Sequence, residues 1–243
     1  MNRRLFLAAG ATATASAFET TQKKTNSLIE LRYYKLRNTS DGMPKRLNDD
    51  LANRYLPALQ KQGIKQVGFF GNLIGAASPY VLQVTEFKNL AQLEASWEIA
   101  AALDYVRMET SLLRSFDGLP ALEMPAVEAG RAPRVFELRT YESNNFRTLG
   151  KKAGMFNNGE IAIFRKTGLN PVFFGETIFG ANQPNLTYML WYDSLAAREA
   201  NWKKFVTHPE WDRLKSTPGL SDAEIVSNIS NSMLNPLAYS PIK

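Results

Sequence analysis

The stretch Ile29-Glu30-Leu31-Arg32-Tyr33-Tyr34 returns later in the chain as Phe136-Glu137-Leu138-Arg139-Thr140-Tyr141. The second copy begins 107 residues after the first (29 to 136), and later landmarks keep a separation of 105 residues, as from Trp97 to Trp202. The same separation relates Gly63 to Gly168, Gly75 to Gly180, and Leu90 to Leu195. A register this constant indicates two copies of one structural unit.

The size of the chain suits a duplication. A chain of 243 residues with 44% hydrophobic residues can bury one or two cores, because domains commonly contain about 100–150 residues. Between the copies, glycine and proline are frequent enough to mark a connection. We therefore predict a first repeat at 28–117, a linker at 118–133 and a second repeat at 134–240.

Composition excludes several classes of site. The formal net charge of +6 falls to +4 without Arg3 and Arg4, and no long run of Lys or Arg accompanies it, so we do not expect a nucleic-acid partner. The chain has no Cys and a single histidine, His208, which excludes thiolate zinc sites, iron–sulfur clusters and Cys nucleophiles. We expect a soluble mature chain with no metal site and no transmembrane segment, because apolar runs stay short of roughly 18–20 residues.

The first residues have the pattern of a targeting segment. Arg3-Arg4 precedes Leu5-Phe6-Leu7 and an Ala/Thr-rich stretch, and Ala15-Ser16-Ala17 offers a cleavage site. We predict a twin-arginine signal peptide at 1–17, followed by a flexible lead-in at 18–27. The protein would then be bacterial and periplasmic or otherwise extracytoplasmic. The alternative is a disordered cytosolic leader.

The first repeat reads as strand, helix, strand, strand, helix. Alternating residues at 28–36 predict a strand with Ile29, Leu31 and Tyr33 on one face and Glu30, Arg32 and Tyr34 on the other. A helix should run from Pro44 to Gly63 with a kink at Pro57. Strands are predicted at 67–74 and 80–87 and a helix from Asn89 to about Met108. Residues 121–127 then offer a short closing strand.

The second repeat predicts the same order. Its elements are a strand at 135–141, a helix at 146–167, strands at 171–179 and 186–192, a helix at 194–204 and a last strand at 222–234. Gly154 and Asn158-Gly159 interrupt the first of these helices, so it is open to being two shorter ones. A further helical turn should follow His208 and end near Lys215.

The repeated polar phrase is the main candidate for a site. Glu30, Arg32 and Tyr34 share one face of a strand, as do Glu137, Arg139 and Tyr141. A strand buried on one face requires no particular residue on the other, so a repeated carboxylate and guanidinium suggest a paired, partly enclosed group. We treat these six residues as candidate ligand-binding residues. The alternative is a cross-strand ion pair retained by duplication.

His208 and Trp211 complete the candidate set because they follow the last predicted helix of the second repeat. His208 precedes Pro209 and Glu210, a pattern that also fits the start of a helix, so it is either a metal or haem ligand or a local structural residue. Trp97, Trp202 and Trp211 stand at helical positions and are expected in the core. No catalytic residue is assigned.

These features together resemble the NIPSNAP family. The resemblance is carried by the Glu-Leu-Arg-x-Tyr phrase, Leu56-Pro57 before Gly63, the stretch 67–71, and Trp202 followed by His208-Pro209-Glu210-Trp211. It implies the dimeric α+β-barrel fold, in which two ferredoxin-like units join their sheets. Its relatives include cofactor-free monooxygenases and haem-handling proteins. The first repeat departs from the family pattern, since Leu103-Asp104-Tyr105-Val106 stands where the second has His208 to Trp211.

The resulting prediction is an α+β protein in which two ferredoxin-like repeats pack as an intramolecular dimeric barrel. Fold does not decide function. Three readings stay open: a small-molecule or protein-partner binding module that is a possible homo-oligomer, a cofactor-free or haem-dependent oxygenase, and a structural scaffold. The sequence itself implies no cofactor, and haem enters only through the resemblance.

Overall fold

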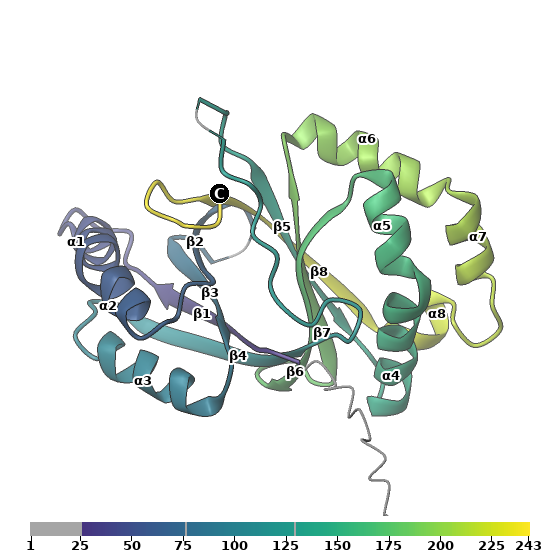
Figure 1. Cartoon of the computed structure of the whole chain (residues 1–243), viewed down its shortest axis with the longest axis horizontal. Helices are drawn as coiled ribbons and strands as arrows, with labels where there is room; N and C mark the ends of the chain where they lie inside the picture. Colours follow the sequence, from purple (N-terminus) through teal and green to yellow (C-terminus); the bar gives the residue numbers. More distant parts are fainter. Residues whose placement is uncertain (1–25, 76, 129) are drawn as a thin grey trace, which may run out of the picture.

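The computed structural model describes residues 26–75, 77–128 and 130–243. The predicted signal peptide at 1–17, and the lead-in up to residue 25, lie outside this part of the chain. Within it, two groups of strands and helices lie side by side and share a central sheet (Figure 1).

Eight strands form a closed antiparallel barrel in the order β1-β3-β2-β8-β5-β7-β6-β4. The first repeat contributes β1 (Leu28–Lys35), β2 (Val67–Ile74), β3 (Tyr80–Phe87) and β4 (Arg107–Ser115). The second contributes β5 (Val135–Glu142), β6 (Asn170–Phe179), β7 (Asn185–Tyr192) and β8 (Asn228–Pro236).

Each repeat supplies four neighbouring strands, and the two sets join at both edges. The first set runs β4-β1-β3-β2 and the second β8-β5-β7-β6, so β2 pairs with β8 and β4 pairs with β6. Closure gives every strand a neighbour on both sides, whereas a separate four-stranded sheet has two edge strands. The predicted α+β class and the pairing of two ferredoxin-like repeats are confirmed.

The helices lie outside the barrel (Figure 1). The first repeat has α1 (Met43–Asp50), the π-helical turn η1 (Leu51–Tyr55), α2 (Leu56–Lys61) and α3 (Leu90–Ala100). The second has α4 (Phe146–Met155), η2 (Phe156–Glu160), α5 (Ile161–Thr167), α6 (Leu195–Val206), α7 (Pro209–Lys215) and α8 (Asp222–Ile225). Within the described chain, no helix is both long and apolar enough to cross a membrane.

Both long helices are interrupted by a π-helical turn at matching places. The break expected at Pro57 is the turn η1, which ends two residues before it, and the missing proline N–H leaves the α-helical pattern incomplete there. In the second repeat, Asn158 and Gly159 leave helical backbone angles within η2. The predicted division of helix 146–167 is therefore confirmed.

Three sequence predictions about the last elements of the repeats are wrong. The fourth strand of the first repeat is β4, not residues 121–127, and α3 ends at Ala100 instead of running to Met108. The helical pattern was extended too far because no Pro or Gly separates the two elements, whereas β4 is fixed by pairing with β1 and β6. In the second repeat, residues 222–225 form α8, and the strand begins only at Asn228.

The strand alternation predicted for β1 decides what each face contacts. Ile29 and Leu31 belong to a cluster contributed by all eight strands, which is the barrel interior. Tyr34 belongs instead to the cluster between the sheet and the helices of the first repeat. Glu30 and Arg32 share the face of Tyr34 and are also buried, so the polar phrase lies beneath the helices and not in the barrel interior.

The segment after β8 returns to the barrel. Ile242 is fully buried in the interior cluster, and a Cβ added to Gly68 would lie 2.9 Å from its side chain. The hydroxyl of Ser240 accepts a hydrogen bond from the Phe69 amide at 2.9 Å. Glycine at position 68 therefore makes room for this segment.

Candidate functional site

The repeated phrase forms one buried network in each repeat. We call the first network the first brace; it consists of Glu30, Arg32, Tyr34, Tyr55, Gln83, Ser96 and Trp97. The second brace consists of Glu137, Arg139, Tyr141, Tyr188, Tyr192, Arg198 and Trp202.

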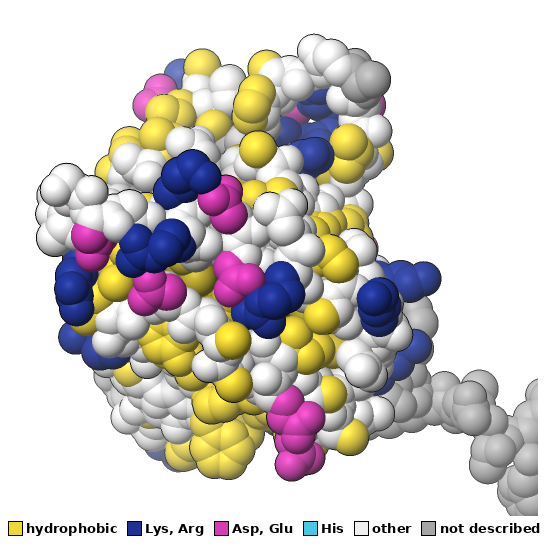
Figure 2. All heavy atoms as spheres, turned by 90° about the vertical axis from the view of Figure 1, so that its left-hand side faces the viewer, with side chains coloured by type: hydrophobic (Ala, Val, Ile, Leu, Met, Phe, Trp, Pro, Cys, Tyr) yellow, Lys and Arg dark blue, Asp and Glu magenta, His cyan; other side chains and the backbone are white. Residues whose placement is uncertain are grey.

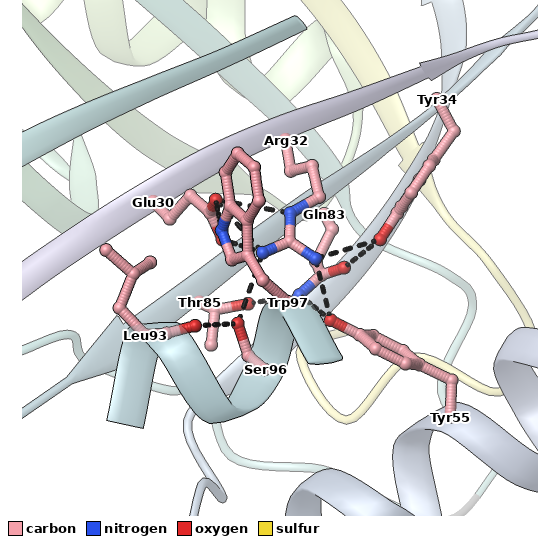
Figure 3. A network of polar contacts seen from close by, with 9 residues as sticks. All are labelled: Glu30, Arg32, Tyr34, Tyr55, Gln83, Thr85, Leu93, Ser96 and Trp97. Carbon is pink, nitrogen blue, oxygen red and sulfur yellow. Dashed lines mark hydrogen bonds and ion pairs between the residues drawn. The ribbon is translucent and has the colours of Figure 1, made fainter. Parts of the chain in front are cut away.

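In the first brace, Arg32 has a partner for each of its five N–H groups. Its Nε and Nη2 donate to Glu30, with 2.8 Å between Nη2 and Oε2, and Nη2 also donates to Ser96 at 3.1 Å. Its Nη1 donates to Tyr34 at 3.3 Å and Tyr55 at 3.1 Å (Figure 3). Arg32 has no exposed surface, so the first brace retains no guanidinium donor for a ligand.

The indole of Trp97 covers this ion pair. Its Nε1 donates to Glu30 at 2.9 Å, and its ring lies 5.1 Å from the Arg32 guanidinium carbon. Burial raises the pKa of Glu30, and the nearby Arg32 guanidinium opposes that rise. Trp97 is 45% exposed, so the prediction that it belongs to the core is wrong. It seals a polar group at the surface.

In the second brace, Glu137 is fully buried and accepts from two guanidinium groups. Arg139 donates to it at 2.8 Å, and Arg198 donates at 2.6 Å and 3.0 Å. Tyr192 and Trp202 also donate to it, at 2.9 Å and 3.0 Å. Although burial favours the neutral acid, these two arginines lower the pKa of Glu137 below its usual value.

Arg139 is less completely bonded than Arg32. Its Nε donates to Tyr188 at 2.8 Å, Nη1 to Glu137, and Nη2 to Tyr141 at 3.1 Å, which accounts for three of its five N–H groups among the described residues. Arg139 is 11% exposed and Arg198 is 26% exposed. With two guanidinium groups and one carboxylate, this brace carries one surplus positive charge.

The ion pair is not cross-strand. In each brace the carboxylate and the guanidinium are two residues apart on one strand, β1 or β5, and therefore share a face. The helix that covers each pair begins at an N-cap residue. The side chains of the N-caps Asn89 and Ser194 accept hydrogen bonds from the amides of Gln92 and Ala197. These caps set the start of α3 and α6 and so place Trp97 and Trp202 over their carboxylates.

A third buried group was not anticipated from the sequence. Lys152 donates to Glu160 and Asp222, both at 3.1 Å, and both Lys152 and Glu160 are buried. Rings of Tyr141, Phe156 and Trp211 lie 5.0–5.5 Å from the Lys152 ammonium. Burial raises the pKa of Glu160 to about 7, and Lys152 opposes the rise. We call Lys152, Glu160 and Asp222 the lysine cluster.

A signal for the lysine cluster was available in the repeat register. The separation of 105 residues places Lys152 opposite Leu47 and Glu160 opposite Tyr55, both of which are buried in the first repeat. A charge at a position whose counterpart is buried and uncharged indicates an ion pair beneath the helices.

His208 and Trp211 have different contacts in the structure and do not form one site. His208 is the N-cap of α7, where its Nδ1 accepts from the Glu210 amide at 3.2 Å. Trp211 packs on Phe205, with 4.6 Å between ring centroids. It reaches the second brace through Phe205, which packs on Trp202, and through Lys152, which lies near Tyr141. In the part of the chain described here, no group of three or more His, Cys, Asp or Glu side chains is arranged to hold a metal ion.

Comparison with known proteins finds a family match for the second repeat. Residues 136–241 match the NIPSNAP family model. No curated protein matches the chain. A NIPSNAP protein of unknown function from Agrobacterium tumefaciens has a TM-score of 0.42 and 15% identity, and the match covers 48% of this chain and 100% of that one.

Solved structures of two other proteins match both repeats together. A provisionally named monooxygenase from Fusobacterium nucleatum has a TM-score of 0.59 and 7% identity, with 88% of this chain and 93% of that one covered. An anthrone oxidase-like protein has a TM-score of 0.57 and 10% identity, with 90% and 94% covered. At such identities the likeness concerns the fold alone.

Proposed function

Residues 136–241 match the NIPSNAP family model, and we propose from the surface of the protein that it is a partner-binding module. The binding face is the outer side of α6, and the partner is α3 of a second copy of the chain. The observation behind this proposal is that α3 and α6 carry opposite charge and expose apolar residues at matching positions.

The exposed apolar residues occupy matching positions in the two repeats. On α3, Leu90 is 62% exposed and Trp97 is 45% exposed. On α6, Leu195 is 40% exposed, Trp202 is half-buried and Val206 is 51% exposed. Tryptophan and arginine are enriched among residues that dominate binding energy in interfaces, and α6 offers Trp202 beside Arg198.

The charges on these helices are complementary. In α3, Glu94 and Glu98 are the only charged residues, whereas α6 has three basic residues against the single acidic Glu199. At one matched position the first repeat has Glu98 and the second has Lys203. Figure 2 shows apolar and acidic side chains beside one another at the lower edge of the face that carries the first repeat's helices. Complementary charge of this kind selects a partner and its orientation.

The two helices lie at opposite ends of the molecule (Figure 1). The α3 and α6 of one copy therefore cannot contact each other, and the proposed contact joins α3 of one copy to α6 of the next. A head-to-tail contact leaves one face free on each end, so it produces rings or open chains of subunits.

Sedimentation velocity over a concentration series tests this proposal. The parent protein should form larger species as concentration rises, and Glu98→Lys or Lys203→Glu should each weaken the association. Combining both changes should restore it, because the charges are exchanged. Lys61→Glu on the exposed side of α2 is the matched control and should have no effect. A parent that stays monomeric at all concentrations contradicts the proposal.

The oxygenase alternative is supported by fold likeness alone. Its cheapest test is the absorbance spectrum of protein purified aerobically, where a Soret band would indicate haem. If His208 were the ligand, only Nε2 would remain for iron, since Nδ1 caps α7. Native mass spectrometry of the same preparation tests the small-molecule alternative, because a retained ligand adds a defined mass.

We also propose that the protein is exported by the twin-arginine route. Support comes from Arg3-Arg4 and the Ala15-Ser16-Ala17 site in the sequence. Replacing both arginines with lysine should hold the protein in the cytoplasm, and the exported parent should begin at Phe18. Export of the double variant would contradict this route.

A further inference from the structure

A pocket of about 260 Å³ lies between the linker that precedes β5 and the segment that follows β8. Its charged lining residues are Glu128, Arg131, Arg134 and Lys243. Counting side chains alone, three cations and one carboxylate give this lining a surplus of two positive charges. The pocket lies outside both braces and the lysine cluster.

Arg134 is the buried group in this pocket. It is 4% exposed, and its guanidinium carbon lies 4.6 Å from the centre of the Trp191 ring. Its Nη1 donates to the carbonyl oxygen of Lys243 at 2.6 Å, but its buried Nε has no hydrogen-bond partner. Burial, assisted by the nearby Arg131 charge, lowers the pKa of Arg134.

No carboxylate side chain of the described residues lies within ion-pair distance of Arg134, whereas both buried arginines of the braces have one. The neighbouring cation is already engaged, since Arg131 pairs with Glu128 at 2.9 Å and with Asp193. A buried guanidinium that no carboxylate side chain contacts is costly, and an anion in contact with it reduces that cost.

The first repeat lacks this arrangement. The repeat register places Arg134 opposite Ser27 and Trp191 opposite Glu86. In the first repeat those two residues contact one another directly, and the Ser27 hydroxyl donates to Glu86 at 2.6 Å. At this place in the fold the first repeat therefore has the carboxylate of Glu86, whereas the second has the guanidinium of Arg134, which can bind a carboxylate.

We propose that this pocket binds a compact oxyanion, a carboxylate or a phosphate, through Arg134. The planar guanidinium presents paired donors that match either group, and stacking on Trp191 fixes its orientation. The volume lies near the lower end for ligand sites, which favours a small molecule over a nucleotide.

Isothermal titration at low ionic strength tests the site with potassium phosphate and with sodium succinate as separate probes, and with sodium chloride as the reference. At least one oxyanion should bind the parent, and the stronger of the two identifies the class. Arg134→Gln should weaken that binding at least about tenfold, since a charge-assisted hydrogen bond contributes roughly 1.5–3 kcal/mol. Arg165→Gln, at an exposed arginine, is the control and should not change it.

Two further variants keep the result interpretable. Arg134→Lys retains the charge and should retain part of the binding even if Arg134→Gln folds poorly. Two glycines added after Lys243 make its carbonyl an ordinary peptide oxygen, and binding should persist in that variant. Failure of the parent to bind either oxyanion overturns the proposal, as does equal binding by parent and Arg134→Gln. Binding by the glycine-extended chain alone also overturns it, because the parent's own terminal group would then occupy the site.

Discussion

The two braces share a Glu, an Arg and a Tyr on their first strand, but their net charges differ. Glu30 and Arg32 balance one another, whereas Glu137 has both Arg139 and Arg198. The additional arginine stands where the first repeat has Leu93. The strand residues and the tryptophan that seals each carboxylate are the shared part, and they hold the covering helix to the sheet. The other helix residues are where the copies diverge.

Beneath the first helices the divergence is larger. The first repeat packs Leu47 and Tyr55 where the second buries Lys152 and Glu160. One copy therefore fills this layer with uncharged side chains and the other with an ion pair that also reaches Asp222 on α8. A buried ion pair contributes little net stability, yet removing one partner is costly. The second repeat should thus be the more sensitive copy to a single substitution here.

Separating the repeats should produce the largest effect. If residues 18–128 and 129–243 are made as two chains, neither can close the barrel, because β2 needs β8 and β4 needs β6. Each half should aggregate or self-associate, and mixing them should restore a compact complex visible by size-exclusion chromatography. Two stable monomeric halves without mutual affinity would show that closure is dispensable.

The braces should differ in their response to loss of arginine. Arg32→Met leaves Glu30 buried without a cation and should cost roughly 3–5 kcal/mol of unfolding free energy. Arg139→Met leaves Glu137 with Arg198 and should cost about 1–3 kcal/mol. Urea denaturation of both variants measures the difference. Equal losses would mean that Arg198 does not compensate.

The lysine cluster can be replaced by its counterpart from the first repeat. Lys152→Met alone leaves Glu160 buried without its cation, so it should destabilise by about 3 kcal/mol or less, because Glu160 can take up a proton. Lys152→Leu combined with Glu160→Tyr introduces the uncharged pair of the first repeat and should cost much less. If the double variant is as unstable as the single one, packing and not charge decides this site.

The smallest expected effect is a pH dependence from Glu160. Its pKa is raised to about 7 in the folded chain, from an ordinary value of 4.5. Between these values the folded state holds a proton that the unfolded state has released, so this group's contribution to stability falls as pH rises and is constant above about pH 7. The size is about 1–3 kcal/mol.

Glu160→Gln provides the reference for that measurement. The difference in unfolding free energy between the parent and this variant should decline from pH 5 to pH 7.5. A difference that is independent of pH would show that Glu160 stays ionised beside Lys152. Glu137 does not produce the same trend, since its lowered pKa acts in the opposite direction and at lower pH.

The sequence predicted the elements whose pattern is local. Strands 67–74 and 80–87 match β2 and β3, and the alternation of β1 placed its polar residues on the correct face. It failed for β4 and for the start of β8, where pairing with distant strands decides the structure. The polar phrase was identified. The contacts of Trp97, Arg198 and Lys152 with the buried carboxylates depend on where the helices lie, which the pattern of one strand does not predict. The helix-start alternative for His208 matches its place as N-cap of α7.

The position of β8 has a consequence for how the protein is made. This strand follows all the others in the chain, yet it lies between β5 of its own repeat and β2 of the first. During synthesis the edges of β5 and β2 stay unpaired until β8 leaves the ribosome. Ile242 reaches the barrel interior after that. Unpaired edges are sites of aggregation, so a chain truncated before β8 should engage chaperones for longer than the complete one.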